Sequence, residues 1–250
     1  MTGRGLKILA LAAALALWPV HGGLQAQGLV ADSSRHLVAI TTGFTGTDVL
    51  LFGTTEGEGD IIIVVRGPTR REVVRRKGRH AGIWVNDTEI VFRDVPSYYW
   101  LASSRPIETL LRPAALDRHG IGVQHLRFAT VGKADADAFA GFRAGLIRNK
   151  VLSGLFTVQS RDVDFLGQRL FRSTIHFPSN VPTGSYTVHV FLVRDGGVAS
   201  AQTVPLTIAK IGLGAEVYRF AHASSVLYGI IAIVIALLAG LFAGVIFRKA

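Results

Sequence analysis

An unbroken apolar segment near the C-terminus constrains this chain more than any other feature. Residues 226–247 contain no charged side chain. As an α-helix, a run of about 22 residues rises about 33 Å, enough to cross the ~30 Å hydrocarbon core of a bilayer. The alternative is a buried helix of a water-soluble core, but a run without a polar face is not typical of one. The sequence therefore predicts one C-terminal transmembrane helix.

The N-terminus has the pattern of a secretory signal. Arg4 and Lys7 precede an uncharged apolar run at residues 8–20, and small and polar residues follow it to Ala26. A positive start, a short apolar run and a small residue at the cleavage position define such a signal. The alternative is a retained membrane helix, although about 13 apolar residues are short for a bilayer. We therefore expect residues 1–26 to be a cleaved signal peptide.

The topology follows from these two segments. Arg248 and Lys249 come directly after the apolar run, and the positive-inside rule keeps such cations in the cytoplasm. The main domain, residues 27–218, is then expected outside the cytoplasm. Residues 219–250 would hold the juxtamembrane segment, the helix and a short cytoplasmic tail. An Ala-, Gly-, Arg- and Val-rich composition indicates a bacterium, so we predict an inner-membrane protein with a periplasmic domain.

The main domain contains mostly strand patterns, which are short apolar and β-branched runs separated by Gly-, Pro- and acid-rich turns. The strands are expected at residues 36–42, 48–52, 60–65, 72–77, 82–85, 89–92, 182–193 and 198–209, with a hairpin turn through residues 78–80. In the clearest strand the side chains alternate between two faces: Tyr186, Val188, Val190 and Leu192 on one, and Thr187, His189, Phe191 and Val193 on the other.

Helical patterns interrupt the strands between about residues 103 and 152. Residues 106–116 have apolar side chains at a spacing of three and four, but Pro113 argues against one unbroken helix. A second helix is expected at residues 138–152. Its apolar side would hold Phe139, Phe142, Leu146 and Val151, whereas Arg143, Arg148 and Lys150 would face water.

The fold prediction combines these patterns. Pro182-x-Gly-x-Tyr186 enters a late strand as it does in immunoglobulin-like sandwiches, where the tyrosine packs back on the preceding corner. We therefore predict a mainly β protein. It would consist of an Ig-like antiparallel β-sandwich with a helical insertion, plus one C-terminal transmembrane helix.

Several segments together carry a family resemblance. They are Val38–Gly46, Val65–Pro68, Arg75–Lys77, Gly82–Asn86, Val95–Tyr99, Ser103–Pro106 and the stretch from Arg219 to Gly229. In this combination the chain resembles the alphaproteobacterial "putative transmembrane protein" family, which has no assigned function. The resemblance implies the same topology, a bacterial envelope location and a transporter-like membrane protein as partner. It brings no catalytic residues.

The densest charge lies at residues 66–79, and its candidate anion-binding side chains are Arg70, Arg71, Arg75, Arg76, Lys77 and Arg79. In an extended strand, alternate residues of this set share one face. A row of like charges favours an anionic counterpart, such as lipid headgroups, an acidic polymer or an acidic protein domain. The alternative is a solvated hairpin whose cations protect a sheet edge from aggregation. Nucleic acid is not expected outside the cytoplasm.

Signals for catalysis or metal binding are weak. The chain has no cysteine, no nucleophile or phosphate-loop motif and no closely spaced histidines. Glu56–Asp60 lacks the 12-residue spacing of a calcium loop. Asp162 and Asp164 are predicted on one face of one short strand, as in a glycosidase, and this hydrolase hypothesis ranks last. We expect no enzymatic activity, no cofactor and no metal.

Gly240 and Gly244 lie four residues apart in the apolar segment, a spacing that lets membrane helices approach closely. They predict association with another membrane protein or a second copy, although small residues are common in membrane helices. The leading hypothesis is a non-catalytic accessory or partner-binding module of an envelope or transport system. The alternative is an anion-binding module that uses the Arg66–Arg79 segment.

Overall fold

The computed structural model describes residues 28–132 and 135–247, so the predicted signal peptide and cytoplasmic tail lie outside it. The strands are β1 (Leu29–Ser33), β2 (Leu37–Ile40), β3 (Gly46–Thr55), β4 (Asp60–Arg66), β5 (Thr69–His80), β6 (Ile83–Pro96), β7 (Tyr99–Ser103), β8 (Ala129–Thr130), β9 (Arg161–Asp162), β10 (Asp164–Leu166), β11 (Leu170–Pro178), β12 (Gly184–Arg194) and β13 (Gly197–Lys210). The helices are α2 (Ile107–Leu110), α3 (Pro113–His119), the 3₁₀ turn η1 (Val123–His125), α4 (Ala136–Leu152), α5 (Leu213–Ala223) and α6 (Ser225–Phe247).

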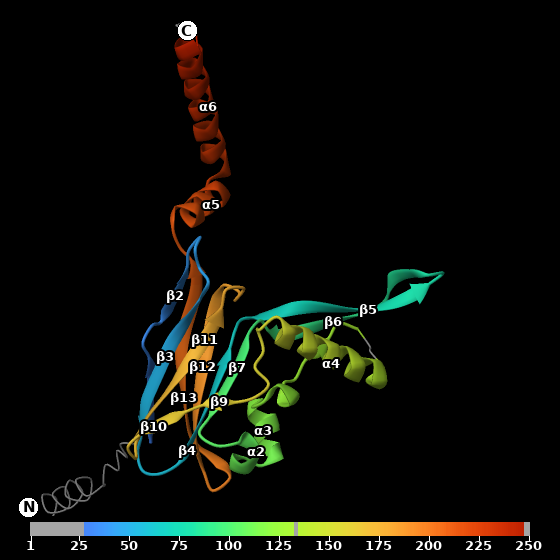
Figure 1. The fold of residues 1–250 in the computed structure, drawn as a ribbon, viewed down its shortest axis with the longest axis vertical. Coiled ribbons are helices and arrows are strands. Elements are labelled where there is room, and N and C mark those ends of the chain that lie inside the picture. Colours follow the sequence, from blue (N-terminus) through green and yellow to red (C-terminus); the bar gives the residue numbers. More distant parts are fainter. Residues whose placement is uncertain (1–27, 133–134, 248–250) are drawn as a thin grey trace, which may run out of the picture.

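Two sheets packed face to face form the body of the protein (Figure 1). One has four strands in the order β1-β3-β11-β10, and the other has six in the order β2-β13-β12-β4-β7-β9. Pairing is antiparallel except for β13 with β2 and β7 with β9. A first core fills the space between the sheets, with Phe171 and Phe177 from one and Val188 and Leu206 from the other. This arrangement is a β-sandwich.

A second core covers the outer face of the six-stranded sheet. Ile62 and Val64 of β4 and Phe191 of β12 meet helices α2, α3 and α4 there. The predicted alternation along β12 is confirmed, because its even-numbered residues enter the first core while Phe191 and Val193 enter the second. Strands buried on both faces form the middle of three layers.

The fold class predicted from the sequence is confirmed. The protein is mainly β, with antiparallel sheets, a helical insertion and one C-terminal apolar helix. The Tyr186 hydroxyl donates to the carbonyl oxygen of Pro182, so the tyrosine does pack back on the corner before β12. The immunoglobulin-like assignment of the sandwich stays a prediction.

The prediction was wrong about the hairpin of the basic segment. The turn lies at Ala81–Gly82, where both residues have positive φ (49° and 88°), and not at residues 78–80. Two such residues form a turn of the primed kind, which matches the twist of the flanking strands. The predicted strands at residues 82–85 and 89–92 are one strand, β6, and the hairpin forms a separate sheet with β8 instead of joining the sandwich.

The helical insertion follows the prediction, apart from the side chains of Arg143 and Lys150. Arg143 does not simply face water, because its guanidinium donates to the carbonyl oxygens of Gln124 and Leu126. Pro113 begins α3 as its first residue and separates it from α2. Helix α4 buries Phe142 and Leu146 as expected. However, Lys150 does not face water: its side chain is 12% exposed because it reaches a carboxylate of β5.

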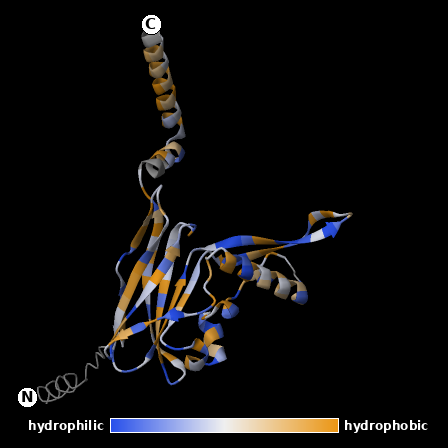
Figure 2. Cartoon of the chain, viewed as in Figure 1, coloured by the Kyte–Doolittle hydropathy of each residue, from blue (hydrophilic) through white to orange (hydrophobic). Residues whose placement is uncertain are grey.

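The C-terminal helices extend away from the sandwich (Figure 1). In the described part of the chain, α6 is the one helix long and apolar enough to cross a membrane. Figure 2 shows that most of its length is hydrophobic. The shorter α5 precedes it and exposes Val217, Tyr218 and Phe220. The Phe220 and Tyr228 rings meet edge to face across the joint, with centroids 6.2 Å apart.

Candidate functional site

A long two-stranded ribbon projects sideways from the body (Figure 1). We call it the arm; it consists of β5 and β6. The 12 residues of β5 correspond to a length of about 40 Å at about 3.3 Å per residue. The pairing register shifts between Arg70 and Glu72 and again between Arg76 and Lys77, so β6 has unpaired residues at both places. Such bulges increase the local twist of a ribbon.

The base of the arm is held by the second core. Phe92 of β6 is fully buried, and its ring centroid lies 6.2 Å from that of Phe128 and 5.7 Å from that of Phe139. Val74 and Ile90 pack against the same core. This packing ties the first half of the arm to α4.

An ion pair adds to this attachment. The Lys150 ammonium of α4 lies 2.5 Å from the Glu72 carboxylate of β5, and the two side chains are 12% and 29% exposed. Removing one member of a poorly solvated pair leaves the other charge without compensation. The pair therefore fixes the side of β5 that faces the helix.

The substitution Lys150→Met is expected to lower the free energy of unfolding by about 1–2 kcal/mol, because the Glu72 carboxylate loses its partner. The double variant Lys150→Met/Glu72→Met should recover most of this loss. Urea unfolding of the three proteins in detergent measures both effects. Losses that simply add in the double variant would contradict the coupling.

All six predicted anion-binding side chains lie on β5, and all are exposed: Arg70, Arg71, Arg75, Arg76, Lys77 and Arg79. The Arg75 Nε atom donates to Glu89 Oε2 across the ribbon at 2.8 Å. Arg76 lies 3.8 Å from the Asp87 carboxylate, and Arg70 donates to the carbonyl oxygen of Thr183. Within the described residues, Lys77 and Arg79 form no ion pair at 4.0 Å or less.

The predicted face of alternate cations exists on β5. Arg75, Lys77 and Arg79 lie opposite Glu89, Asn86 and Trp84 of β6, respectively. Residues directly opposite in an antiparallel pair project to the same face. One carboxylate therefore faces three cations along the outer half of the arm, which leaves this face positive.

The end of the arm is apolar, which the sequence analysis did not foresee. Ile83, Trp84 and Val85 are 68%, 64% and 41% exposed. Figure 2 shows a hydrophilic β5 and hydrophobic residues next to the turn. The three residues form an apolar run typical of a buried strand, but no other layer of the described structure covers them. We call residues 77–86 the tip.

The arm also has a free edge. β5 pairs with β6 alone, so one side of its 12-residue backbone has no neighbouring strand in the described structure. The edges of the sandwich are much shorter strands of two to five residues: β1, β10, β2 and β9. The edge-protection alternative is thus compatible with the cations of β5.

Asp162 and Asp164 were predicted on one face of one short strand, but the structure places them on different strands. Asp162 ends β9 in the six-stranded sheet, whereas Asp164 begins β10 in the four-stranded sheet. Asp164 lies 3.7 Å from Arg172 on the neighbouring strand. The single strand predicted for both is wrong because the chain changes sheets at Val163, which is buried in the first core.

Asp60 of the Glu56–Asp60 segment and His176 have structural partners. Asp60 accepts from Arg105 and Ser104, and the Arg105 bond holds the pKa of this carboxyl below its usual value. His176 pairs with Asp48, and both side chains are exposed. Among the described residues, no three His or acidic side chains form a metal-binding group.

Gly240 and Gly244 lie on α6, where no other part of the described chain approaches within 4 Å of the position of a Cβ atom. The helix therefore presents both glycines to its surroundings. Their predicted role in helix association stays a prediction.

The family comparison matches almost the whole chain. The family model described as "Putative transmembrane protein (Alph_Pro_TM)" covers residues 28–249. The chain belongs to this family. The match agrees with the resemblance found in the sequence, and it includes the sandwich, the arm and the C-terminal helix. Members are thus expected to share a membrane helix behind a β-rich domain. No curated protein and no solved structure gave a significant match.

Proposed function

We propose that this chain is a non-catalytic accessory module of the bacterial inner membrane, whose periplasmic domain binds an acidic surface of a neighbouring membrane protein through the arm. The observation that supports the proposal is the tip: Lys77 and Arg79 lack carboxylate partners among the described residues, next to exposed Ile83 and Trp84. Exposed aromatic residues and arginines are the side chains most enriched at protein interfaces.

The shape of the arm favours a partner beside the protein. The arm leaves the body sideways, away from the long axis that runs through the sandwich and α6 (Figure 1). A helix in the membrane restricts the domain to a thin layer, where encounters with neighbours are frequent. An arm of about 40 Å that projects sideways extends the reach of the domain within this layer.

Edge protection alone does not account for the tip. Cations on an edge strand discourage association, but a large exposed apolar group has the opposite effect. Exposed Ile83 and Trp84 are not expected in an edge strand whose side chains only prevent association. Their position at the far end of the arm, about as distant from the two cores as the ribbon allows, is what a contact element requires.

Anionic lipid headgroups are the second candidate. Tryptophan and cationic side chains are both favoured at membrane interfaces, and the tip combines Trp84 with Lys77 and Arg79. A protein partner is preferred because of the sideways direction of the arm. The experiment below separates the two.

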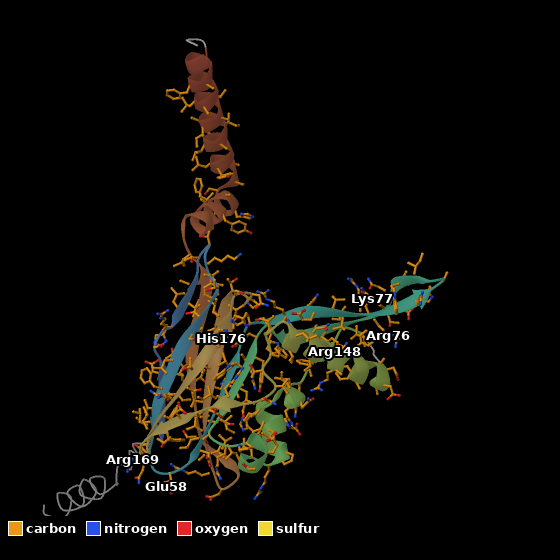
Figure 3. The ribbon with its side chains drawn as sticks, in the orientation of Figure 1. Glu58, Arg76, Lys77, Arg148, Arg169 and His176 are labelled. Carbon is orange, nitrogen blue, oxygen red and sulfur yellow. The ribbon has the colours of Figure 1, made fainter. Side chains whose placement is uncertain are left out.

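A photo-crosslinking residue at position 83, in the full-length chain and in native membranes, tests the proposal. A discrete protein–protein adduct is expected. The double variant Lys77→Glu/Arg79→Glu should reduce its yield at least tenfold, because both unpaired charges change sign. The control variant Arg148→Glu/Arg169→Glu alters the same net charge at exposed positions off the arm and should leave the yield unchanged (Figure 3).

Two outcomes would contradict the protein partner. An adduct of lipid mass with no protein adduct would favour the headgroup candidate. A protein adduct that both double variants reduce equally would show that the total charge matters and the arm does not.

A further inference from the structure

A pocket with several charged residues in its lining lies away from the tip, where the end of β4 meets the end of α3. Its volume is about 280 Å³, and its lining includes Arg66, Arg118, His119 and Arg127. Gly120 ends α3 in the left-handed conformation (φ 58°), so the chain turns sharply there. The Tyr99 hydroxyl donates to the Gly120 carbonyl oxygen at 3.1 Å and accepts from the Gly122 N–H at 2.7 Å. These bonds fix the shape of the pocket wall.

Arg66 is a partly buried cation that has no acidic partner among the described residues. Its Nη2 atom donates to the carbonyl oxygens of His119 and Gly120, which lie at the negative end of α3. Its Nε–H is buried and has no hydrogen-bond partner in the part of the chain that the structure describes. Within the described residues, no carboxylate lies within 4.0 Å of the guanidinium. Burial lowers the pKa of Arg66, as expected where solvation is poor.

Further positive charge surrounds this guanidinium. Arg118 and Arg127 are exposed at the pocket and form no ion pair within the described structure. Of the two carboxylates that line the pocket, Asp117 is held by His125 at 2.6 Å, and Asp94 forms no ion pair at 4.0 Å or less with any described residue. The pKa of His189 is lowered by burial and then by the charges of Arg66 and His119. The region therefore carries an excess of positive charge.

We propose that this pocket binds a small oxyanion group such as phosphate or sulfate, with Arg66 on its inner side and Arg118 and Arg127 at its entrance. Guanidinium groups match the oxygens of such anions with paired hydrogen bonds. An anion would compensate the charge of Arg66, which no side chain in the described structure compensates. The site shares no residue with the tip, so it goes beyond the function proposed above.

Full-length protein in a neutral detergent allows a direct test by calorimetric titration with inorganic phosphate and with sulfate, against chloride at equal ionic strength. Saturable binding is expected for the oxyanions and not for chloride. The variant Arg118→Glu/Arg127→Glu should weaken binding at least tenfold. Both side chains are exposed, so the fold should be retained. Arg66→Lys, which keeps the charge but loses the paired geometry, should also weaken binding.

Controls and a second ligand complete the experiment. Arg148→Glu/Arg169→Glu should bind as the parent does, because these exposed side chains lie outside the pocket. Glycerol 3-phosphate, a soluble lipid headgroup, separates two sources of the same chemistry. Tighter binding than inorganic phosphate would indicate a headgroup, and weaker binding a free anion. Equal responses to chloride and phosphate, or unchanged affinity of Arg118→Glu/Arg127→Glu, would overturn the proposal.

Discussion

The substitution Phe92→Ala is expected to lower the free energy of unfolding by about 3–5 kcal/mol, which is the range for truncating a buried phenylalanine. The Phe92 side chain is fully buried, and it touches the rings of Phe128 and Phe139 from two other segments. Removing its ring leaves a cavity at the point where the arm, the loop before β8 and α4 meet.

In Phe92→Ala, the loss of protection from hydrogen exchange should differ between the two cores. The first core contains no part of the arm, so the amides of β3 and β11 should keep their protection from hydrogen exchange. The amides of β5 and α4, which pack on the second core, should lose protection first. Crosslinking from the tip should fall as well, because the arm would no longer be held at a fixed angle.

Phe52→Ala is the matched control. Phe52 lies on β3 and its side chain is 41% exposed, so the same truncation should cost less than about 1 kcal/mol. Urea unfolding in detergent, with hydrogen exchange on the same samples, measures both variants. Equal losses for Phe52 and Phe92, or a uniform loss of protection after Phe92→Ala, would contradict the view that the second core holds the arm.

The strands of the sandwich were predictable from the sequence where apolar residues recur at regular spacing along the strand. Successive side chains of β12 point to opposite faces, and both faces carry apolar residues. For this reason the strand lies between two cores. β11 was missed although Phe171, Ile175 and Phe177 occur at even spacing, because Arg172, Ser173 and His176 interrupt the apolar run. β1 is five residues long and β9 only two, and strands this short carry little periodic signal.

The sequence predicted the positive charge of the arm, but not that β5 and β6 form a ribbon that projects from the body. A residue pair such as Val73–Val74 fits a sandwich strand as well as a ribbon, so only the scarcity of other apolar residues in β5 hinted that it leaves the core. The exposure of Trp84 depends on the absence of a covering layer, which no local pattern encodes. The pocket was equally hidden, since Arg66 and the carbonyl oxygen of His119 that it contacts are 53 positions apart in the chain.

The charge on Lys150 shows how tertiary structure overrides a helical pattern. Its place on the polar side of α4 predicts contact with water, and an isolated helix would provide it. The arm folds over that side and supplies Glu72, so the lysine becomes part of an interface. Side chains with long apolar stems often bury the stem and pair the charge in this way.

The substitution Gly53→Ala is expected to lower the free energy of unfolding by about 2–3 kcal/mol, in the upper part of the range for adding volume to a packed core. Gly53 lies in the middle strand pair of the four-stranded sheet, opposite Phe171 of β11. A Cβ atom at this position would lie 2.5 Å from the Phe171 ring and even closer to the backbone oxygen of Val30. The strand pair β1–β3 would have to separate, because a backbone oxygen cannot move aside as a flexible side chain can.

The same change at Gly141 should have the opposite sign. Gly141 lies within α4, and beyond the backbone of this helix no atom of the described residues approaches within 4 Å of the position of its Cβ. Alanine there should raise the free energy of unfolding by about 0.5–1 kcal/mol, because it restricts the unfolded chain and favours the helix. The midpoints of urea unfolding of the two variants and the parent protein, measured in one detergent, test both predicted changes in stability. A Gly53→Ala protein as stable as the parent would mean that β1 does not hold its backbone against β3 as closely as described, and that the first core tolerates more volume than its packing indicates.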